Sequence, residues 1–236
     1  MPDGCMEMIF HYGDLYRQFL EDGSFILQPR SFVFGQITIP LEIIPTARTG
    51  ILAARFQPEG FAPFISTDLT KMKNSAVSLI ELFGKAGRQF EHQVLSAQHN
   101  EERVGVIENF LLHRLNTHEA IDSISKSSVA VLQKLKGQLS VDELAGITGV
   151  SKRQLERKFS STIGLSPKQL AKVIRLQATL KMLEQKQFTS LTALAYENGY
   201  FDQAHFIKDF KEFTGMSPKQ FYSDNLKMSV VFIGME

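Results

Sequence analysis

Residues 139–170 read LSVDELAGITGVSKRQLERKFSSTIGLSPKQL, and residues 189–221 read TSLTALAYENGYFDQAHFIKDFKEFTGMSPKQF. These stretches are two copies of one pattern, with one residue inserted in the second copy. The matching positions are Leu144-Ala145 with Leu194-Ala195, Gly149 with Gly199, Phe159 with Phe210, Gly164 with Gly215, and Ser166–Gln169 with Ser217–Gln220. A pattern of this length that occurs twice is one supersecondary unit used twice. The unit therefore decides the fold of this half of the chain.

The first copy predicts two short helices joined by a tight turn. Ser140 and Glu143 have the spacing of a capping box, which favours a helix start. Gly149 is placed to end that helix, and Ser151 is placed to cap a second helix that runs to about Thr162. A helix, a glycine turn and a second helix with a polar outer face form the helix-turn-helix pattern, whose second helix enters the major groove of DNA.

The second copy predicts the same unit, with Gly199 at the turn and Asp202 as the cap. Its second helix is expected to bury three phenylalanines and to expose Gln203, Ala204, His205, Lys208, Asp209 and Lys211. We place the first unit at about 140–163, a linker helix at 167–185 and the second unit at about 190–214. The fifteen residues 171–185 of this linker span roughly 22 Å at about 1.5 Å per residue, which suits successive major grooves about 34 Å apart.

These motifs resemble the AraC/XylS-type transcription regulators over about Ile124 to Tyr222. The resemblance lies in Leu155-x-Arg157-x-Phe159, Gly164-x-Ser166-Pro167 and Gly199-Tyr200-x-Asp202-x-x-x-Phe206-x-x-x-Phe210-Lys211-x-x-x-Gly215-x-Ser217-Pro218. It implies that residues 151–162 and 202–214 are the recognition helices. The base-facing positions that it implies are Arg153, Glu156, Arg157, Gln203, Ala204, His205 and Lys208. Lysines at or beside helix starts are expected to contact phosphates instead: Lys152, Lys168, Lys211 and Lys219.

The N-terminal half, residues 1–118, predicts a small β-region followed by helices. The expected strands are 5–12, 24–28, 32–39, 41–44 and 50–57, and the expected helices are 62–65, 77–83, 85–95 and 100–115. Residues 2–10, 35–36 and 50–60 resemble the degenerate cupin-like domain that precedes AraC-type units in many bacterial regulators. This resemblance implies a sensory or dimerisation domain. Because the Pro2-Asp3-Gly4 turn usually follows earlier strands in such proteins, we expect the domain to be truncated at its start.

These patterns together predict an α+β chain. It has a small cupin-like β-region with helices, followed by an all-α domain of two helix-turn-helix units joined by a linker helix. The DNA-binding domain is expected at 119–228, and the serine cluster at 125–128 marks the expected boundary. Residues 229–236 form an apolar tail, and the overlapping stretch 228–233 is expected to be a strand that could add to a sheet edge.

Charge is unevenly divided between the two halves. The chain has a formal net charge of +1, but residues 126–228 hold 16 Lys and Arg against 9 Asp and Glu, a balance of +7. Residues 1–125 hold 10 against 15, a balance of −5. A positive balance in the helix-turn-helix half is what phosphate binding requires, although basic solvated faces are also common. The single cysteine, Cys5, excludes a disulfide framework and is expected to be a buried core thiol.

The N-terminal half offers few candidates for chemistry. Glu7, Arg55 and Glu59 are polar residues in or beside apolar strands, so they are candidate ligand-binding residues; the alternative is an ion pair that supports the fold, or outward-facing side chains. Only His11 lies on a predicted strand, whereas a cupin-type metal enzyme needs two or three histidines. No metal or cofactor is therefore expected. The sequence has no nucleophile elbow, phosphate-binding glycine loop or dinucleotide fingerprint, so an enzyme is not expected either.

The sequence thus predicts a sequence-specific transcription regulator of bacterial type that is modulated through its N-terminal domain. The expected partner is double-stranded DNA, and the candidate partners are a small-molecule effector, RNA polymerase and a second copy of the chain. Neither a signal peptide nor an apolar run of ~20 residues occurs, which predicts a cytoplasmic, nucleoid-associated protein without a membrane partner. The alternative is a protein-interaction regulator with weak or vestigial DNA binding, which Ala204, Asp209 and Glu212 in the second unit favour.

Overall fold

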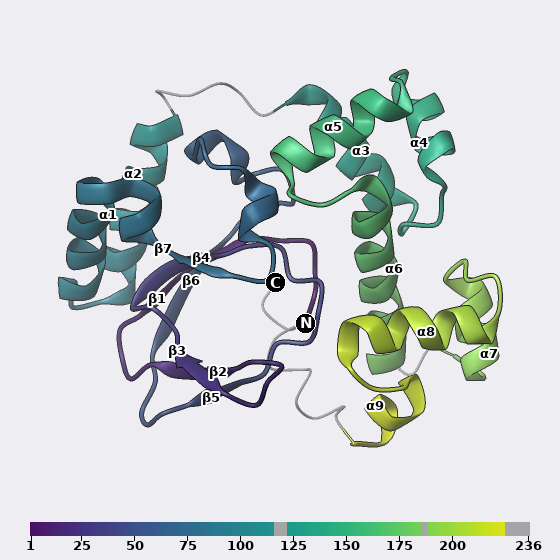
Figure 1. Ribbon diagram of the computed structural model, residues 1–236, viewed down its shortest axis with the longest axis horizontal. Helices are drawn as coiled ribbons and strands as arrows, with labels where there is room; N and C mark the ends of the chain where they lie inside the picture. Colours follow the sequence, from purple (N-terminus) through teal and green to yellow (C-terminus); the bar gives the residue numbers. More distant parts are fainter. Residues whose placement is uncertain (116–121, 186–187, 225–236) are drawn as a thin grey trace.

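The computed structural model describes residues 1–115, 122–185 and 188–224. Sheets with flanking helices form the N-terminal half, and helices alone form the C-terminal half (Figure 1). This is the α+β fold class that the sequence predicts. The predicted tail at 229–236 and the predicted strand at 228–233 lie outside the described residues.

Two antiparallel sheets form the β-region. The larger has the order β6 (Ile51–Arg55), β1 (Glu7–His11), β4 (Ser31–Phe34) and β7 (Ala76–Ser78). The smaller has the order β3 (Phe25–Leu27), β2 (Tyr16–Phe19) and β5 (Ile43–Pro45). The sequence does not predict β2 or β7. Both are too short to show an alternating pattern, and β2 places Arg and Gln between its two aromatic ends.

Helices α1 (Leu79–Ser96) and α2 (Asn100–Leu115) pack beside the larger sheet (Figure 1). The core between them contains Met8 and Phe10 of β1, together with Phe90, all at most 1% exposed. Gly84 has φ 60° and ψ −130° and interrupts α1. This interruption agrees with the two separate helices that the sequence predicts on either side of Gly84. The short helices η1 (Ala62–Phe64) and η2 (Leu69–Met72) connect β6 to β7.

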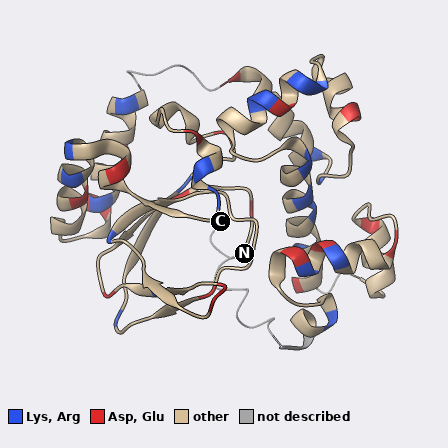
Figure 2. Cartoon of the chain, in the orientation of Figure 1, with Lys and Arg blue, Asp and Glu red and all other residues tan. Residues whose placement is uncertain are grey.

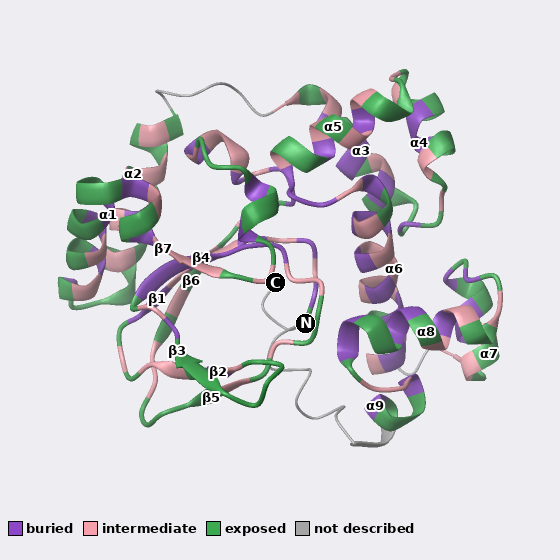
Figure 3. Cartoon of the chain, viewed as in Figure 1, coloured by how far each residue is buried: buried purple, intermediate pink, exposed green. Residues whose placement is uncertain are grey.

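The described C-terminal half consists of helices around two separate cores. In chain order the helices are α3 (Ser123–Lys134), α4 (Val141–Thr148), α5 (Lys152–Thr162), α6 (Pro167–Glu184), α7 (Leu191–Glu197), α8 (Gln203–Thr214) and α9 (Pro218–Asp224). One core joins α3, α4 and α5 around Phe159, and the other joins α7, α8 and α9 around Phe210. Helix α6 contributes Leu170 to the first core and Leu176 to the second, and Figure 3 shows buried residues along its length.

The predicted boundary at serines 125–128 is wrong, because these residues lie inside α3. The helix starts after Asp122, whose side chain accepts a hydrogen bond from the Ser125 backbone N–H at 2.9 Å. Ser125 and Ser128 are fully buried, and Ser125 Oγ lies 2.7 Å from Thr162 Oγ1. Small hydroxyl side chains therefore serve here to pack α3 against α5, and a serine-rich composition misled the linker prediction.

The two halves of the chain contact each other at several places. Gln177 of α6 donates a hydrogen bond to the Pro2 carbonyl oxygen, and Gln133 of α3 donates one to Gln57 at 3.5 Å. Helix η2 lies against the end of α5, where a Cβ added to Gly164 would be 2.9 Å from the Leu69 carbonyl oxygen. The N-terminal half thus contacts the first helix-turn-helix unit and the linker helix directly.

Candidate nucleic-acid interface

The first helix-turn-helix unit is built by the capping residues that the sequence predicts. Ser140 Oγ accepts from the Glu143 N–H at 3.2 Å and Glu143 accepts from the Ser140 N–H at 2.7 Å, so the capping box is complete. These hydrogen bonds lower the pKa of Glu143. Gly149 ends α4 at φ 70°, a conformation that favours glycine. Ser151 then caps α5, accepting from the Gln154 N–H at 3.2 Å.

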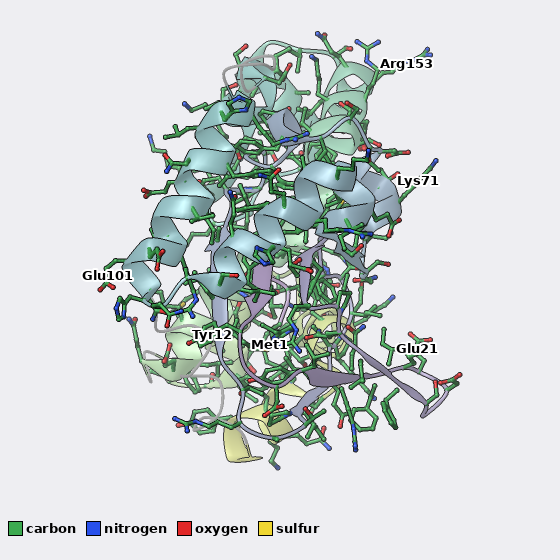
Figure 4. The ribbon with its side chains drawn as sticks, turned by 90° about the vertical axis from the view of Figure 1, so that its left-hand side faces the viewer. Met1, Tyr12, Glu21, Lys71, Glu101 and Arg153 are labelled. Carbon is green, nitrogen blue, oxygen red and sulfur yellow. The ribbon has the colours of Figure 1, made fainter. Side chains whose placement is uncertain are left out.

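Helix α5 presents a basic outer face. Leu155 and Phe159 are 0% exposed, which turns Arg153 and Arg157 towards solvent, while Glu156 is half-buried. Figure 4 shows the Arg153 side chain at the edge of the molecule, pointing away from the ribbon. Lys152 is exposed too, but its Nζ lies 3.1 Å from Asp142 Oδ1 of α4. The ion pairs found among the described residues do not include Arg153 or Arg157, so both are able to meet an anion or a base edge.

The second unit repeats this construction. Gly199 adopts φ 70° in the turn, and Asp202 caps α8 by accepting from the His205 N–H at 2.7 Å. Phe206 and Phe210 are 0% exposed. The face turned away from them carries Gln203, Ala204, Lys208 and Lys211, all exposed, and His205, which is half-buried. Gln203 accepts a hydrogen bond from the Thr192 hydroxyl of α7 at 3.0 Å.

Asp209 does not belong to this exposed face, contrary to the sequence-based prediction. It is 3% exposed, and its Oδ1 lies 2.9 Å from Lys172 Nζ of the linker helix α6. Lys172 also contacts Glu212 at 3.1 Å, and His205 Nε2 lies 3.4 Å from the other Asp209 oxygen. Burial lowers the pKa of Lys172, but the hydrogen bonds to Asp209 and Glu212 outweigh it and raise that pKa. Asp209 is buried because its ion-pair partner, Lys172, lies on another helix. No local sequence pattern shows this pairing.

We expect Asp209→Ala to lower the free energy of unfolding by about 1–3 kcal/mol. The substitution leaves Lys172 without its buried partner; the loss stays below that of a fully buried pair because Lys172 is partly exposed and keeps Glu212. Urea-induced unfolding at neutral pH measures the change. The matched control is Glu212→Ala, whose side chain is 49% exposed and whose loss should stay within about 1 kcal/mol. Equal losses for the two variants would contradict the burial of Asp209.

The linker helix orients both units. Ser166 and Gln169 form a second complete capping box at its start. Further along α6, Arg175 donates to the Gly137 carbonyl at 2.7 Å and to the Gly199 carbonyl at 3.4 Å, and its guanidinium lies 5.2 Å from the Tyr200 ring centre. The side chains of Lys172 and Arg175 therefore tie α6 to the turn and recognition helix of the second unit. Sequence reasoning missed both residues, because their partners are distant in the chain.

The predicted phosphate-contacting lysines are exposed at separate places: Lys152 starts α5, Lys168 starts α6, Lys211 lies late in α8 and Lys219 starts α9. Figure 2 shows Lys and Arg along α5, α6 and α8. This distribution follows both units rather than forming one compact patch.

Two of the three N-terminal candidates lie side by side. Glu7 and Arg55 are direct cross-strand partners on β1 and β6, and Arg55 Nη2 lies 2.5 Å from Asp3 Oδ2. Glu59 lies in the loop after β6, 7% exposed, and burial raises its pKa, as it does that of Glu7. The ion pair of Arg55 with Asp3 agrees with the alternative of a fold-supporting contact.

Cys5 and His11 serve the β-region. Cys5 precedes β1 and is half-buried, and burial with the charge of Asp3 raises the pKa of its thiol to about 11. His11 is 1% exposed, lies 3.2 Å from Gln28 Oε1 through its Nε2, and has its pKa lowered by burial. Within the described ranges, no three residues of the metal-ligating types come together. In the same part of the chain, no helix has the length and apolar character that a membrane span needs.

Two family comparisons match different parts of the chain. Residues 144–223 match the helix-turn-helix domain, and residues 1–78 match a domain of unknown function, DUF6597. Over 98 residues the chain is 34% identical to an uncharacterised HTH-type transcriptional regulator from Haemophilus influenzae, covering 42% of this chain and 33% of that protein. Over 91 residues it is 33% identical to the HTH-type transcriptional regulator MtrA from Neisseria gonorrhoeae, covering 39% and 30%.

Among solved structures, ToxT from Vibrio cholerae is similar at a TM-score of 0.49 and 11% identity, over 92% of this chain and 89% of that one. The chain spans about a third of the length of the two curated relatives it matches. The matched segments are those that hold α4 to α9, with their paired caps and paired cores. Residues 144–223 of the chain are therefore a helix-turn-helix domain of the AraC type, and residues 1–78 match a domain of unknown function.

Proposed function

We propose that this protein is a transcription regulator that places α5 and α8 in successive major grooves of one DNA duplex. The observation that carries the proposal is the paired construction of the two units. Each recognition helix has its own cap and its own core, both cores share α6, and both outer faces expose basic side chains. One rigid element thus holds two readers, as binding to two half-sites requires.

The contacts divide by chemistry. Arg153 and Arg157 on α5 are suited to guanine edges, and Glu156 is suited to accept from a cytosine amine. On α8 the proposed base-facing residues are Gln203, Ala204, His205 and Lys208, of which Ala204 matches Arg153 and Lys208 matches Arg157 in the repeat. Lys152, Lys168, Lys211 and Lys219 position the units through phosphates, which carry affinity but little sequence information.

We further propose that the N-terminal domain, at about 1–118, modulates the DNA-binding domain at 119–228. The contacts of η2 with the end of α5, and of Pro2 with α6, support a path for such modulation. Three further features stay predictions: a contact with RNA polymerase, self-association, and a small-molecule effector near Glu7 and Arg55 or near Glu59. The alternative of a protein-interaction module loses part of its basis, since Asp209 is buried and Glu212 is paired with Lys172.

The test is binding of the full chain to genomic fragments from around its own gene, across a salt series. We expect a specific fragment to be retained at physiological salt. Its affinity should fall about 10²–10⁴-fold between 50 and 200 mM salt, as expected for four to eight phosphate contacts. Weak binding that is the same for every fragment would overturn the proposal.

A further inference from the structure

The turns of the two helix-turn-helix units differ by one residue, and that residue is a phenylalanine. In the first unit the turn runs Gly149, Val150 and then the cap Ser151. In the second it runs Gly199, Tyr200, Phe201 and then the cap Asp202. Val150 and Tyr200 correspond, because each packs into the core of its own unit. Phe201 is therefore the inserted residue, and it has no counterpart in the first unit.

The Phe201 side chain is exposed to solvent at the start of the recognition helix. Its exposure of 85% is the highest of the large apolar side chains in the described part of the chain. Single exposed apolar residues are common on protein surfaces, so exposure by itself indicates nothing. The position of Phe201 is what suggests a role in DNA recognition. It directly precedes the cap of α8 and lies three residues before the exposed Ala204. These two side chains are apolar and flank the predicted base-facing Gln203.

We infer that Phe201, together with Ala204 three residues further along the chain, reads the 5-methyl group of a thymine in the half-site that α8 enters. This inference rests on the proposed DNA-binding function and names the base feature that the second unit reads. Neither side chain can donate or accept a hydrogen bond. Among the groups on the floor of the major groove, the thymine methyl is the one that an apolar side chain recognises. The contact selects thymine at one position of the second half-site.

The two half-sites are then read by different chemistry. In the first unit the cap Ser151 follows Val150 directly, and the exposed readers Arg153 and Arg157 are cationic. In the second unit the reader at the turn is apolar. Removing Phe201 should therefore lower affinity by a factor that does not change with salt, since no phosphate contact is lost.

The experiment uses the full chain and the fragment retained in the salt series, with each thymine replaced in turn by deoxyuridine, which lacks the methyl group. For the unsubstituted protein we expect one thymine whose replacement lowers affinity about fourfold, the amount that burial of one methyl group is worth. Phe201→Ala should bind the unmodified fragment at least about fourfold more weakly and should no longer respond to that replacement. The slope of log affinity against log salt should match that of the unsubstituted protein.

Two controls make the outcome specific. Phe201→Leu keeps an apolar side chain and should keep the response to the methyl group. Tyr196→Ala removes another exposed aromatic residue, 59% exposed on α7, and should leave that response unchanged. Thermal unfolding of Phe201→Ala should match that of the unsubstituted protein, because the ring lies in solvent.

An equal response of Phe201→Ala and the unsubstituted protein to every deoxyuridine would overturn the inference, and would point to a protein contact for the exposed ring. Failure of the unsubstituted protein to prefer any fragment is a different result. It would overturn the proposed DNA-binding function itself, and the methyl readout with it.

Discussion

Replacement of Phe210 by alanine is expected to lower the free energy of unfolding of the second helix-turn-helix unit by about 3–5 kcal/mol. Phe210 is 0% exposed, and its ring centre lies 5.6 Å from that of Phe206 and 5.4 Å from that of Phe221. Truncation removes these edge-to-face contacts and leaves a cavity between α8 and α9. Because the neighbours are aromatic and held by separate helices, they cannot easily move to fill it.

The loss should be local, since the two units have separate cores. Amide hydrogen exchange of the full chain measures this directly: protection should fall in α7, α8 and α9 and persist in α4 and α5. Phe159→Ala is the matched control, because Phe159 holds the corresponding place in the first unit and is also 0% exposed. That variant should show the opposite pattern. Equal loss of protection in both units for either variant would contradict independent cores.

Arg157→Ala is expected to weaken binding to the specific fragment by about 1–3 kcal/mol, or roughly 5–150-fold. Arg157 is exposed on the outer face of α5, and the ion pairs of the described residues do not involve it, so its guanidinium is available for a base edge. A bidentate contact to guanine specifies one base pair. Binding to a panel of single-base variants should therefore show relaxed specificity at one position.

The control for Arg157 removes a positive charge elsewhere. Lys85 is exposed on α1 of the N-terminal half, and Lys85→Ala should leave specificity unchanged. If Arg157→Ala lowers affinity equally on every sequence and reduces the salt slope by about one, Arg157 contacts a phosphate. If affinity does not change at all, Arg157 does not contact the DNA.

The sequence predicts the C-terminal half well because its signals are local. Caps such as Ser140, Ser151 and Asp202, and turn glycines such as Gly149 and Gly199, act within four residues of themselves. The apolar stripes of α5 and α8 have helical spacing and identify the buried faces directly. Helix bounds and core residues follow from these signals without knowledge of the rest of the chain.

Features that depend on residues far apart in the chain cannot be predicted from local sequence patterns. Asp209 belongs to the polar set of α8 by residue type, and only Lys172 on another helix allows its burial. Ser125 has a residue type that is common in linkers, and only its contact with Thr162 in the folded chain shows that it packs between helices. Strand β2 exists because β3 and β5 pair with it on both sides, not because its four residues have a strong preference. These contacts are products of the tertiary structure.

Because α6 contributes to both cores, it holds the two proposed recognition helices at one separation. One base pair added between the half-sites moves the second by about 3.4 Å and turns it by roughly 34°, which a single rigid helix cannot follow. One residue added to α6 would turn α8 by about 100° relative to α5. If the two recognition helices bind successive grooves as we propose, we expect insertions on either side to weaken binding. The set of genes that such a protein regulates would then change over evolution through base substitutions in the half-sites, while the spacing between the half-sites stays the same.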